Sequence, residues 1–264
     1  MDTFQITVLA LIQGLTEFLP ISSSAHLLFP SELLNWPDQG LAFDVVLHMG
    51  TLSAVVYYYR CSLRSMSNDF FRSFKTKQLT ADAKLAWGVI LGTIPVGLAG
   101  LLFKDFIELN LRSIEVVAYT TIIFGLLLGL SDWLHRKKDK LREIITWRDV
   151  VIVGLFQAVA LVPGTSRSGI TITALLLLGL SYKLSLKFAF LLSIPVIILS
   201  ALLMTLDLAA SPHRIDWLGL LLGFVISAIA AYATISMFIR LVDRVGMLPF
   251  VLYRLLLGGL LFLL

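Results

Sequence analysis

A polar interruption in a long apolar stretch decides the fold: residues 150–180 are largely apolar but contain PGTSRSG at 163–169. A second apolar stretch, 4–34, is interrupted in the same way by PISSS at 20–24. Each stretch is too long for one transmembrane helix and each half is too short, because a bilayer core needs about 20 apolar residues in a helix. Both stretches therefore predict re-entrant helical hairpins. Such non-helical tips are tolerated at membrane depth only against protein or a wet cavity.

The composition of the whole chain is that of a membrane protein. Of the 264 residues, 58% are hydrophobic and only 14% are charged, whereas a soluble domain has about 25% charged residues. Six further apolar runs have the length of a full span, namely 41–59, 85–103, 114–133, 185–206, 217–239 and 248–264. The predicted fold class is an all-α polytopic membrane protein with six full transmembrane helices and two re-entrant helical hairpins. The single cysteine excludes a disulfide scaffold.

The basic residues indicate the orientation in the membrane. They form two groups, each predicted to be a loop, namely Arg60, Arg64, Arg72, Lys75, Lys77 and Lys84, and Arg136, Lys137, Lys138, Lys140, Arg142 and Arg148. Two spans separate the groups, so both lie on one side, which the positive-inside rule makes cytoplasmic. Lys183, Lys187, Arg240 and Arg244 are then cytoplasmic too, whereas the loop 31–40, with Glu32 and Asp38, and the loop around Pro212 are external. Both termini are predicted external, without a cleavable signal peptide. Neither group is interleaved with aromatic residues for base stacking, so no nucleic-acid partner is expected.

The two interruptions resemble each other. FLPISS at 18–23 can be set against LVPGTS at 161–166, and Gln13 and Gln157 precede them at nearly equal distances. Because one hairpin opens outside and the other inside, we predict an inverted-topology repeat, with halves at about 1–134 and 148–264 in one integral membrane domain. A basic cytoplasmic loop joins the halves. Such repeats place a site near the midplane between discontinuous helices. Chance similarity between two short Pro- and Ser-containing breaks is the alternative.

Ionisable residues inside a membrane are costly and are functional candidates by default. Glu17, His26 and Arg167 are the deepest, and all three adjoin the breaks. Gln13 and Glu17 are four residues apart and share a helix face. The pair could hold a divalent cation, Mg²⁺ or Ca²⁺, or Glu17 could act as a general base. A purely structural ion pair between Glu17 and Arg167 is equally compatible with the spacing.

Hydroxyl groups follow both breaks. Ser22 or Ser23 would cap a restarting helix, whose N-terminus attracts phosphate, with His26 one turn further on. A role for these groups as nucleophile and acid or base is one interpretation, and a histidine that is merely hydrogen-bonded is the other. At the second break, Arg167 can grip a phosphate bidentately while Ser166, Ser168 and Thr171 lie alongside, which predicts a phosphate cradle.

Three other groups have simpler interpretations. Asp44 and His48 share a helix face and either form a cavity rim or pair with each other, and we favour the pair. Tyr253 and Arg254 could reach an external headgroup, although snorkelling of Arg254 is the simpler interpretation. Small residues such as Gly92, Gly97 and Gly100 suit close helix packing and leave a homodimer open.

The sequence resembles the bacterial undecaprenyl-diphosphatases, also called bacitracin-resistance proteins. The resemblance rests on QGLTEFLP at 13–20, followed by Ser22, Ser23 and His26, and on PGTSRSGIT at 163–171. Weaker agreement occurs at FDVVLHMGT, 43–51, and PFVLYR, 249–254. Many relatives carry Glu where this chain has Gln13, which halves the carboxylate charge there.

The resemblance implies hydrolysis of undecaprenyl diphosphate to undecaprenyl phosphate and inorganic phosphate, with dependence on a divalent cation. The reaction would take place at the periplasmic or external side of the bacterial cytoplasmic (inner) membrane, recycling the carrier lipid for peptidoglycan synthesis. Glu17, His26 and Arg167 would be essential. Attack could come from His26, from a Ser22 or Ser23 hydroxyl, or from a water oriented by Glu17. The prenyl tail would lie in an apolar groove open to membrane lipid. A secondary transporter or lipid flippase for a phosphorylated prenyl lipid is the alternative, because its broken helices would look the same.

Overall fold

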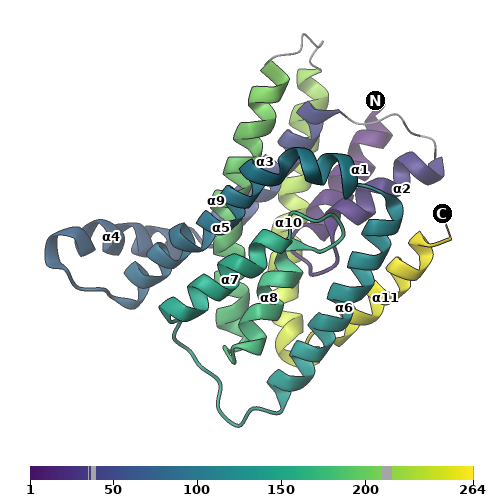
Figure 1. The fold of residues 1–264 in the computed structure, drawn as a ribbon. Coiled ribbons are helices and arrows are strands. Elements are labelled where there is room, and N and C mark those ends of the chain that lie inside the picture. Colours follow the sequence, from purple (N-terminus) through teal and green to yellow (C-terminus); the bar gives the residue numbers. More distant parts are fainter. Residues whose placement is uncertain (35, 37–39, 210–215, 264) are drawn as a thin grey trace.

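The structure, a computed structural model, describes residues 1–34, 36, 40–209 and 216–263. In this part of the chain the regular elements are helices (Figure 1). They are α1 (Thr3–Thr16), α2 (Ser23–Leu34), α3 (Leu41–Tyr58), α4 (Arg60–Thr76), α5 (Ala81–Asn110), α6 (Ile114–Arg136), α7 (Trp147–Val159), α8 (Arg167–Leu177), α9 (Tyr182–Ala209), α10 (Trp217–Val245) and α11 (Leu248–Leu261). The loop around Pro212, like Asp38 of the predicted loop 31–40, lies outside the described residues.

Five of the six predicted full spans are confirmed by length and apolar composition. They are Leu41–Tyr58, Ala81–Ile107, Ile114–Arg136, Tyr182–Leu206 and Trp217–Val245. The sixth, predicted over 248–264, is the 14-residue helix α11. A helix of that length is shorter than a bilayer core about 30 Å thick. The chain is therefore a multi-pass membrane protein with at least five long apolar helices among its described residues.

Both interrupted stretches consist of two short helices with a non-helical break between them, as the sequence predicts. The helices α1 and α2 have 14 and 12 residues, and α7 and α8 have 13 and 11. A serine with a left-handed backbone immediately precedes each restarting helix, Ser22 with φ 72° and Ser166 with φ 67°. Residues other than glycine rarely adopt a positive φ. Both breaks therefore share an unusual backbone conformation at this serine.

The two halves also begin alike. The helix α1 begins with a capping box between Asp2 and Gln5, and α7 begins with one between Thr146 and Asp149. In a capping box the N-cap side chain binds the third backbone N–H of the helix, and the third side chain binds back. The corresponding residues of the two helices are 144 positions apart, as are Ser22 and Ser166. This register differs by one residue from the predicted alignment of Pro20 with Pro163.

Glycines let the broken helices pack closely against long ones. A Cβ atom on Gly14 of α1 would lie 2.6 Å from Ala230 Cβ of α10. A Cβ atom on Gly154 of α7 would lie 2.9 Å from the carbonyl oxygen of Gly92 in α5. The helix pairs α1–α10 and α7–α5 are thus held at backbone distance, which fixes both breaks in the middle of the molecule (Figure 1).

The first basic group, predicted as a loop, is mostly the amphipathic helix α4, which projects from the rest of the molecule in Figure 1. Its apolar side chains recur at helical spacing. The rings of Phe70 and Phe74 pack against Trp87 of α5, with centroids 4.8 and 5.5 Å apart. Charge density alone indicated a loop, but the apolar periodicity within the basic segment favours a helix.

The close approach at Gly154 can be tested by adding one methyl group. We expect Gly154→Ala to lower the free energy of unfolding by about 1–3 kcal/mol, because the new methyl overlaps backbone that cannot move away cheaply. Gly259→Ala is the control, since a Cβ atom there has nothing within 4 Å. Thermal unfolding of both purified variants in detergent measures the difference, and equal midpoints would contradict the assigned contact.

Candidate active site

A cavity of about 210 Å³ lies between the two chain breaks. The turn between α1 and α2, the break between α7 and α8, and the helices α3, α5 and α9 contribute to its wall. Its polar lining includes Glu17, Ser22, Ser23, Ser24, His48, Ser166 and Arg167. Residues far apart in the sequence therefore meet in one polar chamber, at the position that the two interruptions predict.

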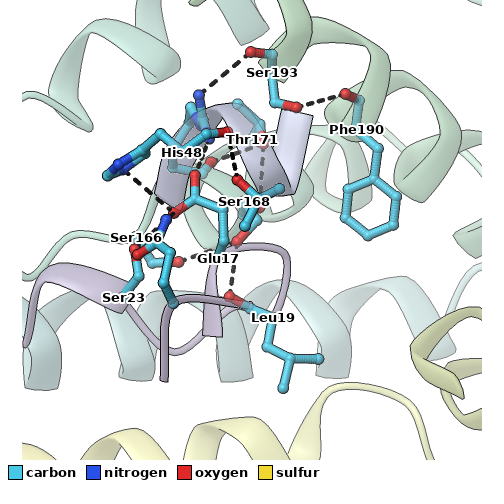
Figure 2. Close-up of polar contacts among 12 residues, drawn as sticks. Glu17, Leu19, Ser23, His48, Ser166, Ser168, Thr171, Phe190 and Ser193 are labelled. Carbon is cyan, nitrogen blue, oxygen red and sulfur yellow. Dashed lines mark hydrogen bonds and ion pairs between the residues drawn. The ribbon is translucent and has the colours of Figure 1, made fainter. Parts of the chain in front are cut away.

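Glu17 is the centre of this chamber (Figure 2). It is buried and follows the last residue of α1. Its Oε1 accepts a short hydrogen bond from Arg167 Nη2, and its Oε2 accepts from Gln13 Nε2 at 2.9 Å and from Ser23 Oγ at 2.8 Å. The carboxylate thus joins the two breaks, and the predicted proximity of Glu17 and Arg167 is confirmed.

The two candidate serines of the first break have different partners. Ser23, the first residue of α2, donates its hydroxyl to the Glu17 carboxylate. The Ser22 hydroxyl is instead 3.0 Å from the hydroxyl of Ser24. Ser23 is therefore the hydroxyl that a carboxylate base can deprotonate directly, since general bases act within hydrogen-bond reach.

The residues of the second break divide into two sets. Arg167 and Ser166 line the cavity, and Arg167 Nη1 also donates to the Ser193 carbonyl oxygen at 3.4 Å. Ser168 and Thr171 are buried. The Ser168 hydroxyl donates to the Leu19 carbonyl oxygen at 2.8 Å, and the Thr171 hydroxyl donates to carbonyl oxygens of its own helix. Arg167 is thus placed to bind a ligand. Ser166 lines the cavity while its hydroxyl caps α8 by accepting from the Gly169 N–H at 3.2 Å, and Ser168 and Thr171 hold the backbone around them.

His26 faces away from the chamber. Its Nδ1 donates to the Ser22 carbonyl oxygen at 2.6 Å, and its Nε2 lies 2.6 Å from the Tyr253 hydroxyl of α11. The two rings stack with an interplanar angle of 2°. Both ring nitrogens are thereby engaged, and His26 braces the left-handed Ser22 against α11 on the outer side of the turn.

His48 lies on the cavity wall, so the favoured pairing of its side chain with Asp44 is wrong. Its Nδ1 donates to the main-chain oxygen of Asp44 at 2.8 Å, and its Nε2 lies 3.8 Å from Glu17 Oε2. The alternative of a cavity rim, which the same spacing allowed, is the correct one. An imidazole within an apolar span was the signal for this role.

Arg254 is fully buried, so the predicted snorkelling to the surface is wrong. Its guanidinium donates to five main-chain carbonyl oxygens at 2.9 to 3.3 Å, which belong to Thr120, Thr121, Pro20, Gly164 and Thr165. These carbonyls come from α6 and from both breaks. A guanidinium has five N–H groups, so every donor is used in joining the two breaks to α6. An arginine one turn or more inside an apolar helix was the signal that sequence reasoning set aside.

Comparison with known proteins identifies the family of the chain. Residues 6–260 match the family model of BacA, described as bacitracin resistance protein. The chain belongs to the BacA family. It is 60% identical over 262 residues to a protein of Vesicomyosocius okutanii subsp. Calyptogena okutanii named undecaprenyl-diphosphatase, with 99% of each chain covered. It is 56% identical to the protein of that name from Ruthia magnifica subsp. Calyptogena magnifica, with 99% and 98% covered. It is 55% identical to undecaprenyl-diphosphatase 2 of Stutzerimonas stutzeri, with 99% and 97% covered.

In this BacA family member, a metal site built from protein groups alone does not fit the chamber. Both Glu17 oxygens already accept hydrogen bonds, one of them from the cationic Arg167. The buried Gln13 Oε1 lacks a hydrogen-bond partner, and His48 Nε2 lies 3.8 Å from Glu17 Oε2. Among the described residues, no group of three or more His, Cys, Asp or Glu side chains gathers as metal ligands do. The metal role predicted for Gln13 and Glu17 stays a prediction.

Replacing the buried guanidinium should loosen both breaks at once. We expect Arg254→Lys to lower the free energy of unfolding by about 2 kcal/mol or more, because three ammonium donors cannot satisfy five buried carbonyls. Arg240→Lys on the exposed face of α10 is the control. Thermal unfolding in detergent measures both variants. Equal midpoints would show that the Arg254 bonds do not support the fold.

Proposed function

We propose that this chain is an undecaprenyl-diphosphate phosphatase, which hydrolyses undecaprenyl diphosphate to undecaprenyl phosphate and inorganic phosphate. Curated relatives with this name share 51 to 60% identity with it over almost the whole chain. One structural observation carries the chemistry: Glu17 joins a serine hydroxyl and a guanidinium in one chamber. A phosphatase needs a nucleophile, a base and a cation that neutralises phosphate charge.

The Glu17–Arg167 ion pair is the resting state of the proposed mechanism. An entering diphosphate offers Arg167 two or more anionic oxygens in place of one carboxylate oxygen, and it is also attracted by the N-terminus of α8. Transfer of the guanidinium from carboxylate to phosphate leaves Glu17 free to accept a proton. Substrate binding thus activates the base.

Ser23 is the proposed nucleophile. Its Oγ forms a bond with the terminal phosphorus while its proton passes to Glu17, and the bond from that phosphorus to the bridging oxygen breaks. Undecaprenyl phosphate leaves, stabilised by the positive charge of Arg167. The proton on Glu17 passes to the departing undecaprenyl phosphate, which restores the carboxylate. Water then attacks the phosphoserine and gives a proton to Glu17, the bond from phosphorus to Ser23 Oγ breaks, and Glu17 returns the proton to Oγ as inorganic phosphate leaves. The hydrogen bond of 2.8 Å between Ser23 and Glu17 supports this assignment over attack by His26.

His26 acts as a positioning residue in this scheme. Its bond to the Ser22 carbonyl oxygen holds the left-handed residue that precedes Ser23. The backbone of Ser23 at the start of α2 is set by that residue, and so is the direction of the Ser23 hydroxyl. Loss of the imidazole would misplace the nucleophile, without removing a reacting group.

Any divalent cation, Mg²⁺ or Ca²⁺, belongs to the substrate in this proposal. Mg²⁺ commonly keeps several waters and binds substrate phosphates together with one or two protein carboxylates. Undecaprenyl diphosphate can bring such a cation with it, and the spare Gln13 Oε1 is the neutral oxygen nearest to the carboxylate for it to meet.

The finer architecture is proposed as an inverted repeat with two re-entrant hairpins in the bacterial inner membrane, the site facing outward. The repeat is supported by the capping boxes at the starts of α1 and α7 and by the positive φ of the serine in each break. The matching packing of α1 against α10 and of α7 against α5 also supports it. The second basic group supports the orientation. Arg136 and Lys138 donate to the carbonyl oxygens of Val245 and Leu177 at the ends of α10 and α8, far from both termini in Figure 1. The proposed outcome for the cell is recycling of the carrier lipid for peptidoglycan synthesis, and thereby bacitracin resistance.

Phosphate release in detergent micelles tests the proposal against a transporter or flippase, which needs two compartments. We expect the purified wild type to release phosphate from undecaprenyl diphosphate. Arg167→Ala and Glu17→Gln should lower kcat/KM by about 10²–10⁴-fold, because each removes a group that acts on the transition state. Ser53→Ala, whose hydroxyl bonds only within α3 in the described structure, should stay within about twofold. An inactive wild type, with translocation in vesicles, would favour the transporter.

The nucleophile can be identified by trapping. Acid quenching of the wild type with substrate labelled on the terminal phosphorus should leave label on the protein, at Ser23 by peptide mapping. Ser23→Ala should show neither label nor more than about 1% of wild-type turnover, since it removes the attacking oxygen. Full turnover by this variant would instead assign the attack to water oriented by Glu17.

A further inference from the structure

A second cavity, of about 310 Å³, runs between α5 and α9 beside the chamber. We call it the α5–α9 groove. Apolar side chains and two glycines form most of its wall, among them Val96, Gly97, Gly100, Leu199, Leu203 and Met204, while Lys104 and Arg112 also line it. The outer flanks of both helices carry exposed leucines, such as Leu101 at 67% and Leu202 at 55% exposure. In a membrane these flanks face lipid, so the groove lies between the chamber and the hydrocarbon.

The groove is continuous with the catalytic chamber. The two cavities share lining residues from α5, from the second break and from α9, namely Val96, Leu161, Val196, Ser200 and Met204. A third cavity, of about 470 Å³, meets the chamber at Ser23, Ser24 and His48. The groove has the larger share of apolar lining residues, and it shares Arg112 and Met204 with the third cavity. A mainly apolar groove that opens from the chamber matches a ligand with an anionic head and a hydrocarbon tail.

The glycines of α5 serve two different purposes. Gly92 is packed: a Cβ atom there would lie 3.1 Å from Leu192 Cδ1. Gly97 and Gly100 line the groove instead, and an added Cβ would make only ordinary contacts, with Leu199 Cδ1 at 3.9 Å and Leu161 Cδ2 at 3.8 Å. Glycine within a helix costs about 0.5–1 kcal/mol relative to alanine. No close helix packing at Gly97 and Gly100 compensates for this cost. The absence of side chains at these two positions instead widens the groove.

We propose that the α5–α9 groove binds the first isoprene units of the substrate, next to the diphosphate, and that Gly97 and Gly100 determine which chains it accepts. This inference rests on the proposed function. The occupant follows from continuity with the chamber, because a chain attached to a diphosphate at Arg167 must leave through an opening, and the groove is the more apolar one. Each isoprene unit carries a methyl branch, which needs more width than a straight acyl chain.

Filling the groove with a larger side chain tests the inference. We expect Gly97→Leu and Gly100→Leu to raise the KM for undecaprenyl diphosphate about tenfold or more, with kcat within about threefold, because they remove binding that is equal in ground and transition states. Gly97→Ala and Gly100→Ala are the matched controls and should stay within about twofold, since a methyl group meets nothing closer than 3.8 Å. Wild-type KM in well-folded Leu variants would overturn the inference.

Photolabelling keeps the test independent of variant folding. Wild-type protein in detergent, with a farnesyl diphosphate that carries a diazirine on the unit next to the phosphate, should be labelled within 96–107 and 196–204. Label only at other segments would overturn the inference. So would labelling of these segments by a diazirine phospholipid that undecaprenyl diphosphate fails to displace, because an acyl chain would then be the occupant. Failure of the proposed function has a different signature, namely a wild type that releases no phosphate from any prenyl diphosphate.

Discussion

The bonds of one buried guanidinium, that of Arg254, allow the chain to be broken twice inside an apolar protein. Each break releases main-chain carbonyls from helical hydrogen bonding, and a bilayer offers no water to satisfy them. Arg254 donates to three carbonyls of the breaks and to two of α6, so one side chain from the last helix satisfies both interruptions. Because these bonds span both halves, the breaks are held in a fixed relation to each other, and the chamber between them is defined before any ligand enters.

The reactive groups depend on that fixed relation. Glu17 belongs to the first break and Arg167 to the second, and the carboxylate neutralises the guanidinium in the absence of substrate. A buried charge is retained only when it is paired and hydrogen-bonded, so the protein keeps these two charged groups by pairing them with each other. The proposed mechanism uses the same pair in a different arrangement, in which phosphate replaces the carboxylate. Stability of the empty site and activation by substrate thus arise from one interaction.

Much of the fold and the central ion pair of the site could be predicted from the sequence, because few arrangements satisfy buried charges and buried backbone groups in lipid. The short helices, the breaks and the meeting of Glu17 with Arg167 follow from the cost of charge and free backbone in lipid. The partners of a helix face could not be predicted, because residue spacing shows which side chains share a face but not which element packs against it. His26 and His48 show this, because one contacts Tyr253 outside the chamber and the other contacts Glu17 within it. Arg254 was misjudged because a long basic side chain on an apolar helix can ordinarily extend to the membrane surface.

The chamber's two unlike extensions also bear on what happens after the reaction. Inorganic phosphate is soluble in water and finds the polar side at Ser24 and His48, while the monophosphate lipid stays anchored by its hydrocarbon between α5 and α9. In this proposal, the solubility of each product decides which cavity it enters. The lipid product in this proposal stays in the bilayer, and no step of extraction from the membrane is required.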